Sequence, residues 1–377
     1  MKITSKFDSG NIEVVDANDP ADVQLRIAKD NASDFFQWFH FRVSGARGVD
    51  CRFVLQNAGE AAYPKGWEGY RACASYDRRH WFRVPTDYDG TVLTISHTPE
   101  HDSVYYAYFA PYSRERHRDL IARCQLSPLV RLDVLGETLD GEDLDLLIVD
   151  TAPDGAKKER RACWVIARQH PGETMAEWWM EGFLDRLLDP ADPVARAVLD
   201  RAVLYVVPNM NPDGSRRGNL RTNASGANLN REWAEPSMAK SPEVFLVRQR
   251  MTETGVDFAL DVHGDEALPY NFIAASENVP SMSDRQRAAL DGFKRALVQA
   301  NPDFQTEHGY PVAKKANLAI CSANLMESFG CLAMTLEMPF KDNADAPDAA
   351  VGWSPARSAK LGAGCLAALH AVIDDLR

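Results

Sequence analysis

The alternation of apolar, strand-like runs with helical patterns, from about residue 127 onward, is the feature that most constrains how this chain can fold. The strand-like runs lie at 162–168, 202–210, 256–264 and 331–340. Longer helical patterns such as 174–188 and 283–300 separate them, and the chain closes on another helical pattern. Strands that alternate with helices pack into an α/β layer structure. We therefore predict a mixed or largely parallel sheet flanked by helices.

The amino-terminal part of the chain has a different pattern. More than half of all aromatic residues lie before Arg116, in less than a third of the length. They fall in short runs such as FFQWFHFRV, RFVLQNA and SVYYAYFA, and turn-forming pairs such as Asp89-Gly90 separate these runs. Many short strands at this spacing predict an all-β sandwich or a barrel-like module. We therefore predict a β-sandwich domain at 1–115 and an α/β domain at 116–377, with the boundary between residues 110 and 130.

The charge balance argues against some classes of function. The chain has 54 acidic and 42 basic residues, for a formal net charge of −12. This balance disfavours general binding to nucleic acid and docking on anionic membranes. No apolar run reaches the roughly 18–20 residues of a membrane span. Because the seven cysteines are scattered and the first residues lack the apolar core of an export signal, we expect free thiols and a cytoplasmic location.

Metal-binding chemistry lies at the ends of two predicted strands, where open α/β sheets bind ligands. His170 and Glu173 flank the pair Pro171-Gly172, which favours a tight turn of type II and brings imidazole and carboxylate together. His263 closes the strand at 256–264 and completes a set of two histidines and one carboxylate. Zinc in such a site keeps a position open for water. Taken singly, the first motif is more often a surface turn beside a helix start, and the second is more often a hydrogen-bonded structural histidine.

Two further features place charge beside such a site. The segment 211–221, which runs on to 228–233, is expected to form a long loop and concentrates arginines, whose planar fork suits carboxylates and oxyanions. Glu337 interrupts an apolar strand, where an unpaired carboxylate is costly. Next to a metal-bound water it would serve as a general base. A structural ion pair with an arginine is the alternative. Asp261 is suited to orient an imidazole.

The order of these motifs matches a known family. HPGET, NPDGSRRGNLRTNASGANLNREW, DVHGD and TLE follow one another as in zinc metallocarboxypeptidases of the M14 clan, which the chain resembles over nearly its whole length. The NLNREW ending and FAPYS at 109–113 look most like the cytosolic carboxypeptidase subfamily, whose members carry a β-sandwich ahead of the peptidase domain. The resemblance implies a hydrolase that removes the carboxy-terminal residue of a peptide or protein, with one zinc ion (Zn²⁺) per chain.

The resemblance also assigns roles to single residues. His170, Glu173 and His263 match the zinc ligands of the family. Glu337 matches the general base that activates the zinc-bound water and then protonates the leaving amine. Arg221 matches the arginine that polarises the scissile carbonyl and holds the oxyanion.

The substrate-binding residues follow in the same way. Asn230 and Arg231 match the pair that binds the terminal carboxylate of the substrate. Many members also place a mobile tyrosine over the substrate, between the last histidine and the glutamate. Only Tyr270 and Tyr310 lie in that interval. Tyr270 follows the ligand strand too closely, which leaves Tyr310 as the candidate.

The subfamily resemblance implies a preference for terminal glutamate. Such a pocket needs a cation beyond Arg231, and Arg216, Arg217, Lys314 and Lys315 are the candidates.

Two other functions fit parts of the pattern. A zinc amidohydrolase of the aspartoacylase or succinylglutamate desuccinylase type uses similar motifs on small acylated amino acids. A non-catalytic module with the same fold would capture carboxy-terminal tails without cutting them. The long NPDG segment and the leading β domain favour the peptidase over the first, and the intact set of ligands and base favours it over the second. The sequence does not predict the oligomeric state.

Overall fold

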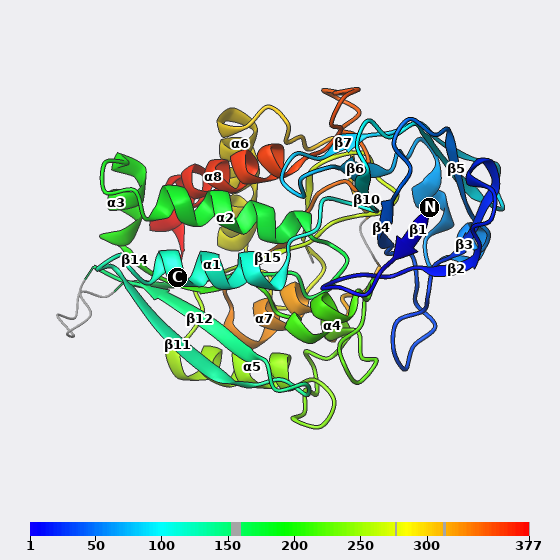
Figure 1. Ribbon diagram of the computed structural model, residues 1–377. Helices are drawn as coiled ribbons and strands as arrows, with labels where there is room; N and C mark the ends of the chain where they lie inside the picture. The colour runs from blue at the N-terminus through cyan, green and yellow to red at the C-terminus, as the bar shows by residue number, and fades with distance from the viewer. Residues whose placement is uncertain (152–159, 276, 312–313, 377) are drawn as a thin grey trace.

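The computed structural model describes residues 1–151, 160–275, 277–311 and 314–376. Two regions lie side by side in it: a β region with strands β1 to β10, drawn in blue and cyan, and an α/β region that begins with α1 (Arg114–Cys124) (Figure 1). Ser113 caps α1 by accepting the amide hydrogen of Arg116. Since α1 packs against β12 and α4, it belongs with the α/β region, and the proposed division between residues 115 and 116 falls in its first turn.

The β region contains two five-stranded sheets. One has the order β1 (Lys2–Thr4), β4 (His40–Ser44), β10 (Ser103–Ala107), β6 (Cys73–Ser75), β7 (Phe82–Arg83). The other has the order β2 (Glu13–Asp16), β3 (Val23–Arg26), β5 (Cys51–Leu55), β9 (Leu93–His97), β8 (Thr86–Tyr88). Phe41 of the first sheet packs on Phe53 of the second, with ring centroids 5.7 Å apart, and both are fully buried. The predicted all-β sandwich and its aromatic core are confirmed.

The α/β region is built on one seven-stranded mixed sheet. Its order is β11 (Val130–Glu137), β12 (Asp143–Val149), β14 (Ala202–Val207), β13 (Arg161–Ala167), β15 (Phe258–Val262), β17 (Leu332–Glu337), β16 (Phe272–Ala274). The strands β14, β13, β15 and β17 run parallel, whereas β11, β12 and β16 are antiparallel to their neighbours. The four strands predicted from the apolar runs are these four parallel strands.

Helices cover both faces of this sheet (Figure 1). On one side lie α2 (Met175–Leu187), α3 (Pro193–Leu199), α6 (Asp284–Ala300) and α8 (Pro355–Val372); on the other lie α5 (Pro242–Thr254) and α7 (Cys321–Phe329). Gly182 of α2 and Gly362 of α8 allow these two helices to pack backbone to backbone. A Cβ atom at Gly182 would lie 2.0 Å from the carbonyl oxygen of Ala359, so no larger residue fits there. The predicted α/β layers are confirmed.

The carboxyl ends of three parallel strands meet at one edge of the sheet. Ala167 of β13 is level with Val262 of β15, which in turn is level with Leu336 of β17. The residues that follow these positions therefore lie next to one another, although they are far apart in sequence. This register brings His263 and Glu337 to the same edge as the turn after β13.

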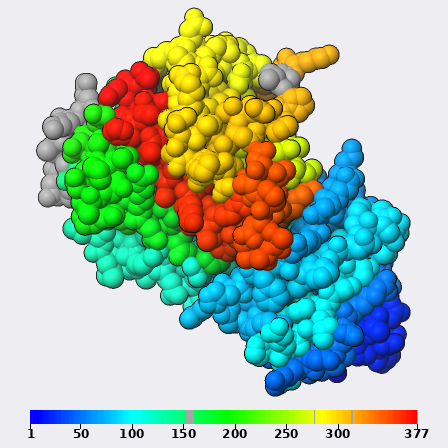
Figure 2. All heavy atoms as spheres, turned by 90° about the horizontal axis from the view of Figure 1, so that it is seen from above, coloured from blue at the N-terminus to red at the C-terminus, as the bar shows by residue number. Residues whose placement is uncertain are grey.

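The β region packs on the flank of the α/β region, beside the segment that precedes α8 (Figure 2). Arg83 of β7 donates to the carbonyl oxygens of Phe340 and Trp353, at 2.8 and 3.1 Å. The rings of Tyr108 and Phe340 stack with centroids 4.4 Å apart. These buried contacts join the two regions next to the end of β17. In the described part of the chain every helix is too short or too polar to cross a membrane.

Candidate active site

Two imidazoles and one carboxylate converge at the edge of the sheet. His170 Nδ1 lies 2.7 Å from Glu173 Oε1, and His263 Nδ1 lies 2.7 Å from Glu173 Oε2. The two Nδ1 atoms are 3.1 Å apart, and all three side chains are buried. Among the described residues this is the group whose ligand atoms lie close enough together to hold one metal ion.

The turn after β13 brings His170 and Glu173 together. The amide of Glu173 donates to the carbonyl oxygen of His170, as expected for a tight turn. The predicted type II geometry is wrong, because Gly172 does not have the positive φ that it requires. Glycine is needed at 172 for another reason: a Cβ atom there would lie 2.9 Å from the carbonyl oxygen of Leu220, which accepts the amide hydrogen of Gly172.

The outer ring nitrogens of both histidines have acceptors that fix the rings. His170 Nε2 lies 3.0 Å from Asn228 Oδ1, and His263 Nε2 lies 2.9 Å from Asp261 Oδ2. A proton on each Nε2 leaves the Nδ1 atoms to face the common centre. The carboxylate of Asp261, predicted to orient an imidazole, lies against His263.

The convergence of these groups requires a positive charge at their centre. Burial and the nearby Arg221 lower the pKa of His170 to about 4, so this ring is neutral at pH 7. Burial would also lower the pKa of His263, but the carboxylates of Asp261 and Glu173 outweigh it and raise that pKa well above its usual value. The two carboxylates therefore favour a positive charge between the three groups. A divalent cation meets the same need, and nitrogen and carboxylate donors suit zinc.

Glu337 ends β17 beside this group. Its side chain is buried, and its Oε2 atom has no hydrogen-bond partner among the described residues. Burial raises the pKa of Glu337 well above its usual value, and the carboxylates of Glu173, Asp265 and Glu266 add to this, against the opposing effect of His263. The alternative of an ion pair between Glu337 and an arginine is not observed in the described part of the chain.

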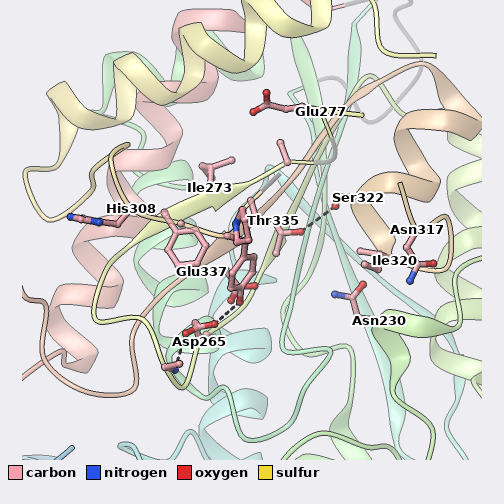
Figure 3. Close-up of a pocket in the computed structure, with 18 of the residues that line it drawn as sticks. Asn230, Asp265, Ile273, Glu277, His308, Asn317, Ile320, Ser322, Thr335 and Glu337 are labelled. Carbon is pink, nitrogen blue, oxygen red and sulfur yellow. Dashed lines mark hydrogen bonds between the residues drawn. The ribbon is translucent and has the colours of Figure 1, made fainter. Parts of the chain in front are cut away.

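Three basic or amide side chains predicted from the arginine-rich segment line the same cleft. Arg221 Nη1 lies 4.0 Å from Glu173 Oε1, and its guanidinium lies over the ring of Tyr63 at 5.2 Å. Asn230 accepts the amide hydrogen of Cys321 at 2.9 Å through Oδ1, and its amide nitrogen points into the cleft (Figure 3). Arg231 also lines the cleft.

The cleft has a volume of about 630 Å³ and extends from the metal-ligand group to α6 and α7. Thr335 and Ser322 form its neutral polar floor and are joined by a hydrogen bond of 3.3 Å between their hydroxyl oxygens (Figure 3). Ile273 and Ile320 lie beside them. Glu277 lies at the far end of the cleft, away from Asn230 (Figure 3).

Tyr310 lines the cleft and donates to Asp265 Oδ2 at 2.5 Å. Its side chain is about half exposed, so it borders both the cleft and solvent. Tyr270 instead stacks on His308, with ring centroids 4.1 Å apart. This placement is consistent with the choice of Tyr310 over Tyr270, and the substrate-covering role stays a prediction.

Two of the four candidate cations for an acidic side chain lie elsewhere. Arg216 and Arg217 both lie in α4 (Pro212–Arg217), a short helix inside the predicted long loop, and both bind Asp140 at 2.7–2.8 Å. The prediction that Arg216 or Arg217 supplies the cation of the pocket is therefore wrong, because neither lines the cleft. Of the two lysines, Lys315 lines the cleft.

Other residues of the site carried no signal in the sequence. Tyr63 of the β region and Glu266 both line the cleft. Burial raises the pKa of Glu266 to about 8, against the opposing charge of Arg221. Lys294 of α6 lines the cleft and lies 3.3 Å from Glu277 Oε1. Because these residues come from three separate segments, only the folded chain brings them to the site.

Two family descriptions match the chain. Residues 3–109 match the cytosolic carboxypeptidase N-terminal domain, and residues 122–344, more than half of the chain, match the zinc carboxypeptidase family. The chain belongs to the zinc carboxypeptidase family. It is therefore a metallocarboxypeptidase, a hydrolase that acts on peptide bonds.

Known relatives of this metallocarboxypeptidase share its whole fold. A metallo-carboxypeptidase from Burkholderia cenocepacia is 51% identical, with a TM-score of 0.97 and 99% of each chain covered. A metallo-carboxypeptidase from Pseudomonas aeruginosa, solved in complex with (2-guanidinoethylmercapto)succinic acid, is 48% identical, with a TM-score of 0.96 and 100% of each chain covered. Human cytosolic carboxypeptidase 1 is 30% identical over 286 residues, which are 65% of this chain but only 23% of that protein. The chain thus matches about a quarter of the length of this human carboxypeptidase.

Proposed function

We propose that this metallocarboxypeptidase holds one zinc ion through His170, Glu173 and His263 and releases the carboxy-terminal residue of a peptide or protein. The observation that carries the proposal is the convergence of two Nδ1 atoms and one carboxylate on a common centre that requires positive charge. A bound zinc ion would supply Lewis-acid chemistry, lowering the pKa of a coordinated water and polarising the scissile carbonyl.

Glu337 is the proposed general base. Its Oε2 atom, buried and without a protein partner among the described residues, would accept a proton from the attacking water. The same carboxyl group would then deliver that proton to the nitrogen of the leaving amino acid. A positive charge at the metal position lowers the pKa of Glu337 and keeps its carboxylate ionised for the first of these steps.

Arg221 is the proposed oxyanion-stabilising residue. Its guanidinium lies beside Glu173, so it faces the same point of the cleft as the metal ligands. In a buried site, a fixed cation stabilises the negative charge that develops on the carbonyl oxygen more strongly than water does.

Asn230 and Arg231 are proposed to bind the terminal carboxylate of the substrate. Asn230 is held through its Oδ1 atom by the amide of Cys321, which leaves the amide nitrogen free to donate. Arg231 adds a planar pair of donors suited to a carboxylate. A substrate held there must end at this point, and this explains removal of a single terminal residue.

Terminal glutamate is the preference that the cytosolic carboxypeptidase resemblance implies. Lys315 and Lys294 are the cations that line the cleft beyond Arg221 and Arg231. The opposite preference, for terminal lysine or arginine, has its own support. Glu277 and Glu307 also line the cleft, and the Pseudomonas aeruginosa relative is described with a guanidino-bearing dicarboxylic acid. Turnover of matched peptides that end in Glu, Lys, Phe or Ala decides between them, and faster cleavage of Lys would reject the glutamate preference.

The experiment that tests the proposed reaction combines metal analysis with substrate choice. We expect one zinc per chain, loss of activity on chelation and recovery on adding zinc. Peptide substrates should be cleaved faster than N-acetyl-aspartate or N-succinyl-glutamate. Faster cleavage of the acylated amino acids would favour the amidohydrolase alternative. A chain that binds peptides without zinc or turnover would favour the non-catalytic alternative.

A further inference from the structure

A carboxylate of the β region holds the backbone next to Arg221. Asp30 is only 3% exposed. Its Oδ1 atom accepts the amide hydrogen of Leu220 at 2.6 Å, and its Oδ2 atom accepts the amide hydrogens of Arg221 and Thr222 at 2.8 and 2.9 Å. The hydroxyl of Thr222 donates to the same oxygen at 3.0 Å. One side chain therefore binds three consecutive amides of another region of the molecule.

The segment that carries Arg221 is irregular. It lies between α4 and the short helix η4 (Leu229–Arg231), and residues 219–228 form neither helix nor strand. Helices and strands fix a backbone through their own ladders of hydrogen bonds, but an irregular segment needs outside partners. The carboxylate of Asp30 is such an outside partner, because three amides of the segment donate charge-assisted hydrogen bonds to it. Asp30 thus sets the backbone conformation from which the side chain of Arg221 projects.

The same part of the β region also confines the side chain of Arg221. The guanidinium lies 5.7 Å from the ring centroid of Phe35 and 5.2 Å from that of Tyr63. Asn31 extends the contact, because it donates to the carbonyl oxygen of Ala224 at 2.7 Å and accepts from the side chain of Asn219 at 2.7 Å. Backbone and side chain of Arg221 are therefore both held from outside the α/β region.

We propose that Asp30 is a positioning residue for Arg221 and that the β region thereby completes the active site. Asp30 does not line the cleft, so it acts through Arg221 and not on the substrate. This inference rests on the proposed role of Arg221 in catalysis. It assigns to the β region a function in the reaction itself, beyond its contribution to folding.

A double-mutant cycle on the zinc-loaded full chain tests this coupling. We expect Asp30→Asn to lower kcat about tenfold to a hundredfold with a much smaller change in KM, since the oxyanion interaction is made in the transition state. We expect Arg221→Ala to lower kcat about a hundredfold or more. Adding Asp30→Asn to Arg221→Ala should lower kcat by less than about twofold further. Equal losses in both backgrounds would overturn the inference.

The matched control is Arg83→Gln. Arg83 is also a buried charged residue of the β region, and it donates to the carbonyl oxygens of Phe340, Val351 and Trp353 in the α/β region, outside the segment that carries Arg221. We expect this change to lower the stability of the contact between the regions without the loss of kcat. A similar loss of kcat in both variants would mean that Asp30 matters only for stability, and this would overturn the inference.

Amide hydrogen exchange provides a readout that does not depend on activity. In Asp30→Asn we expect the amides of residues 220–222 to exchange at least about tenfold faster, and in Arg83→Gln we expect no change there. Unchanged exchange in Asp30→Asn would overturn the inference even if the enzyme were inactive on every peptide. Faster exchange in an enzyme without peptidase activity would instead count against the proposed function alone. Should Asp30→Asn fail to fold, Asn31→Ala is measured in the same way, with an expected loss in kcat of about threefold.

Discussion

The metal-ligand group and the arginine segment share one cleft but are held in place by different means. His263 and Glu337 stand at the ends of β15 and β17, and His170 and Glu173 lie in the turn that follows β13. The register of the buried parallel strands fixes all four. Arg221 lies in an irregular segment, and its position depends on Asp30 and on two rings of the other region. The sheet thus places the groups proposed to hold zinc and activate the water, and the packing of the two regions places the arginine proposed to stabilise the oxyanion.

The largest loss of activity should come from a change on the sheet-held side of the site, which comprises His170, Glu173, His263 and Glu337. We expect Glu337→Gln to lower kcat about a thousandfold or more, because an amide cannot accept the proton of the attacking water. Zinc content should stay at one per chain, since Glu337 is not among the ligand atoms that converge. Peptide turnover and metal analysis on the same sample check this. Retained full activity would remove Glu337 from the role of base.

A smaller effect is expected for a change in the arginine segment. Arg231→Ala should raise KM for peptides about tenfold to a hundredfold, because it removes a contact that is made with the substrate carboxylate before and during the reaction. Peptides with an amidated carboxy terminus serve as the control and should lose little. An equal loss for amidated and free peptides would contradict the assignment of Arg231 to the terminal carboxylate.

A third test asks whether Asp261 is needed to hold the ring of His263 in place on the sheet-held side. We expect Asp261→Asn to weaken zinc affinity about tenfold to a hundredfold, since the amide leaves the imidazole less basic and less firmly oriented. Competition with a chelator of known affinity measures this. At saturating zinc, kcat should recover most of its value. A zinc affinity equal to that of the parent protein would show that β15 alone suffices to hold the ring.

A fourth test concerns stability and pH on the arginine side. Glu243, fully buried at the start of α5, accepts from Asn223 Nδ2 at 3.1 Å, and burial raises its pKa to about 7. Because the folded pKa exceeds the unfolded one, the folded state binds more protons between about pH 4.5 and 7, and the contribution of Glu243 to stability falls as pH rises through that window.

Glu243→Gln removes this titration and keeps an acceptor for Asn223. We expect its free energy of unfolding relative to the parent to rise by about 2–3 kcal/mol between pH 4.5 and pH 8. Denaturant unfolding at both pH values checks this prediction. A difference that does not change with pH would contradict it.

The sequence predicts the sheet-held side of the site well. Apolar runs mark β13, β15 and β17, and the chemistry-bearing residues His263 and Glu337 stand at the ends of two of these strands, where a local pattern can find them. The proposed ligand pair His170 and Glu173 is recognisable because the two residues are three positions apart with a tight turn between them. The wrong turn type at Gly172 shows the limit, because the glycine is required by Leu220, almost 50 residues later in the chain.

The arginine side was predicted less completely for the same physical reason. The short helix α4 and the pairing of Arg216 with Asp140 depend on a segment some 75 residues earlier. Asp30 has no local pattern that distinguishes it from any other acidic residue of the amino-terminal part. Its proposed role depends on hydrogen bonds to three amides that lie about 190 residues later in the chain. Contacts between residues so far apart in the sequence cannot be predicted from periodicity or from the spacing of motifs.

The positive centre formed by His170, Glu173 and His263 has a consequence for handling the protein. The carboxylates of Asp261 and Glu173 raise the pKa of His263, so a bound zinc ion would compete with a proton for this ring, and we expect zinc affinity to weaken at low pH. A bound ion would also tie the turn after β13 to β15, and a site built from segments so far apart in sequence forms only when the chain folds. The melting temperature should therefore climb with free zinc concentration, and a preparation stripped during purification would melt early without any change in its covalent structure.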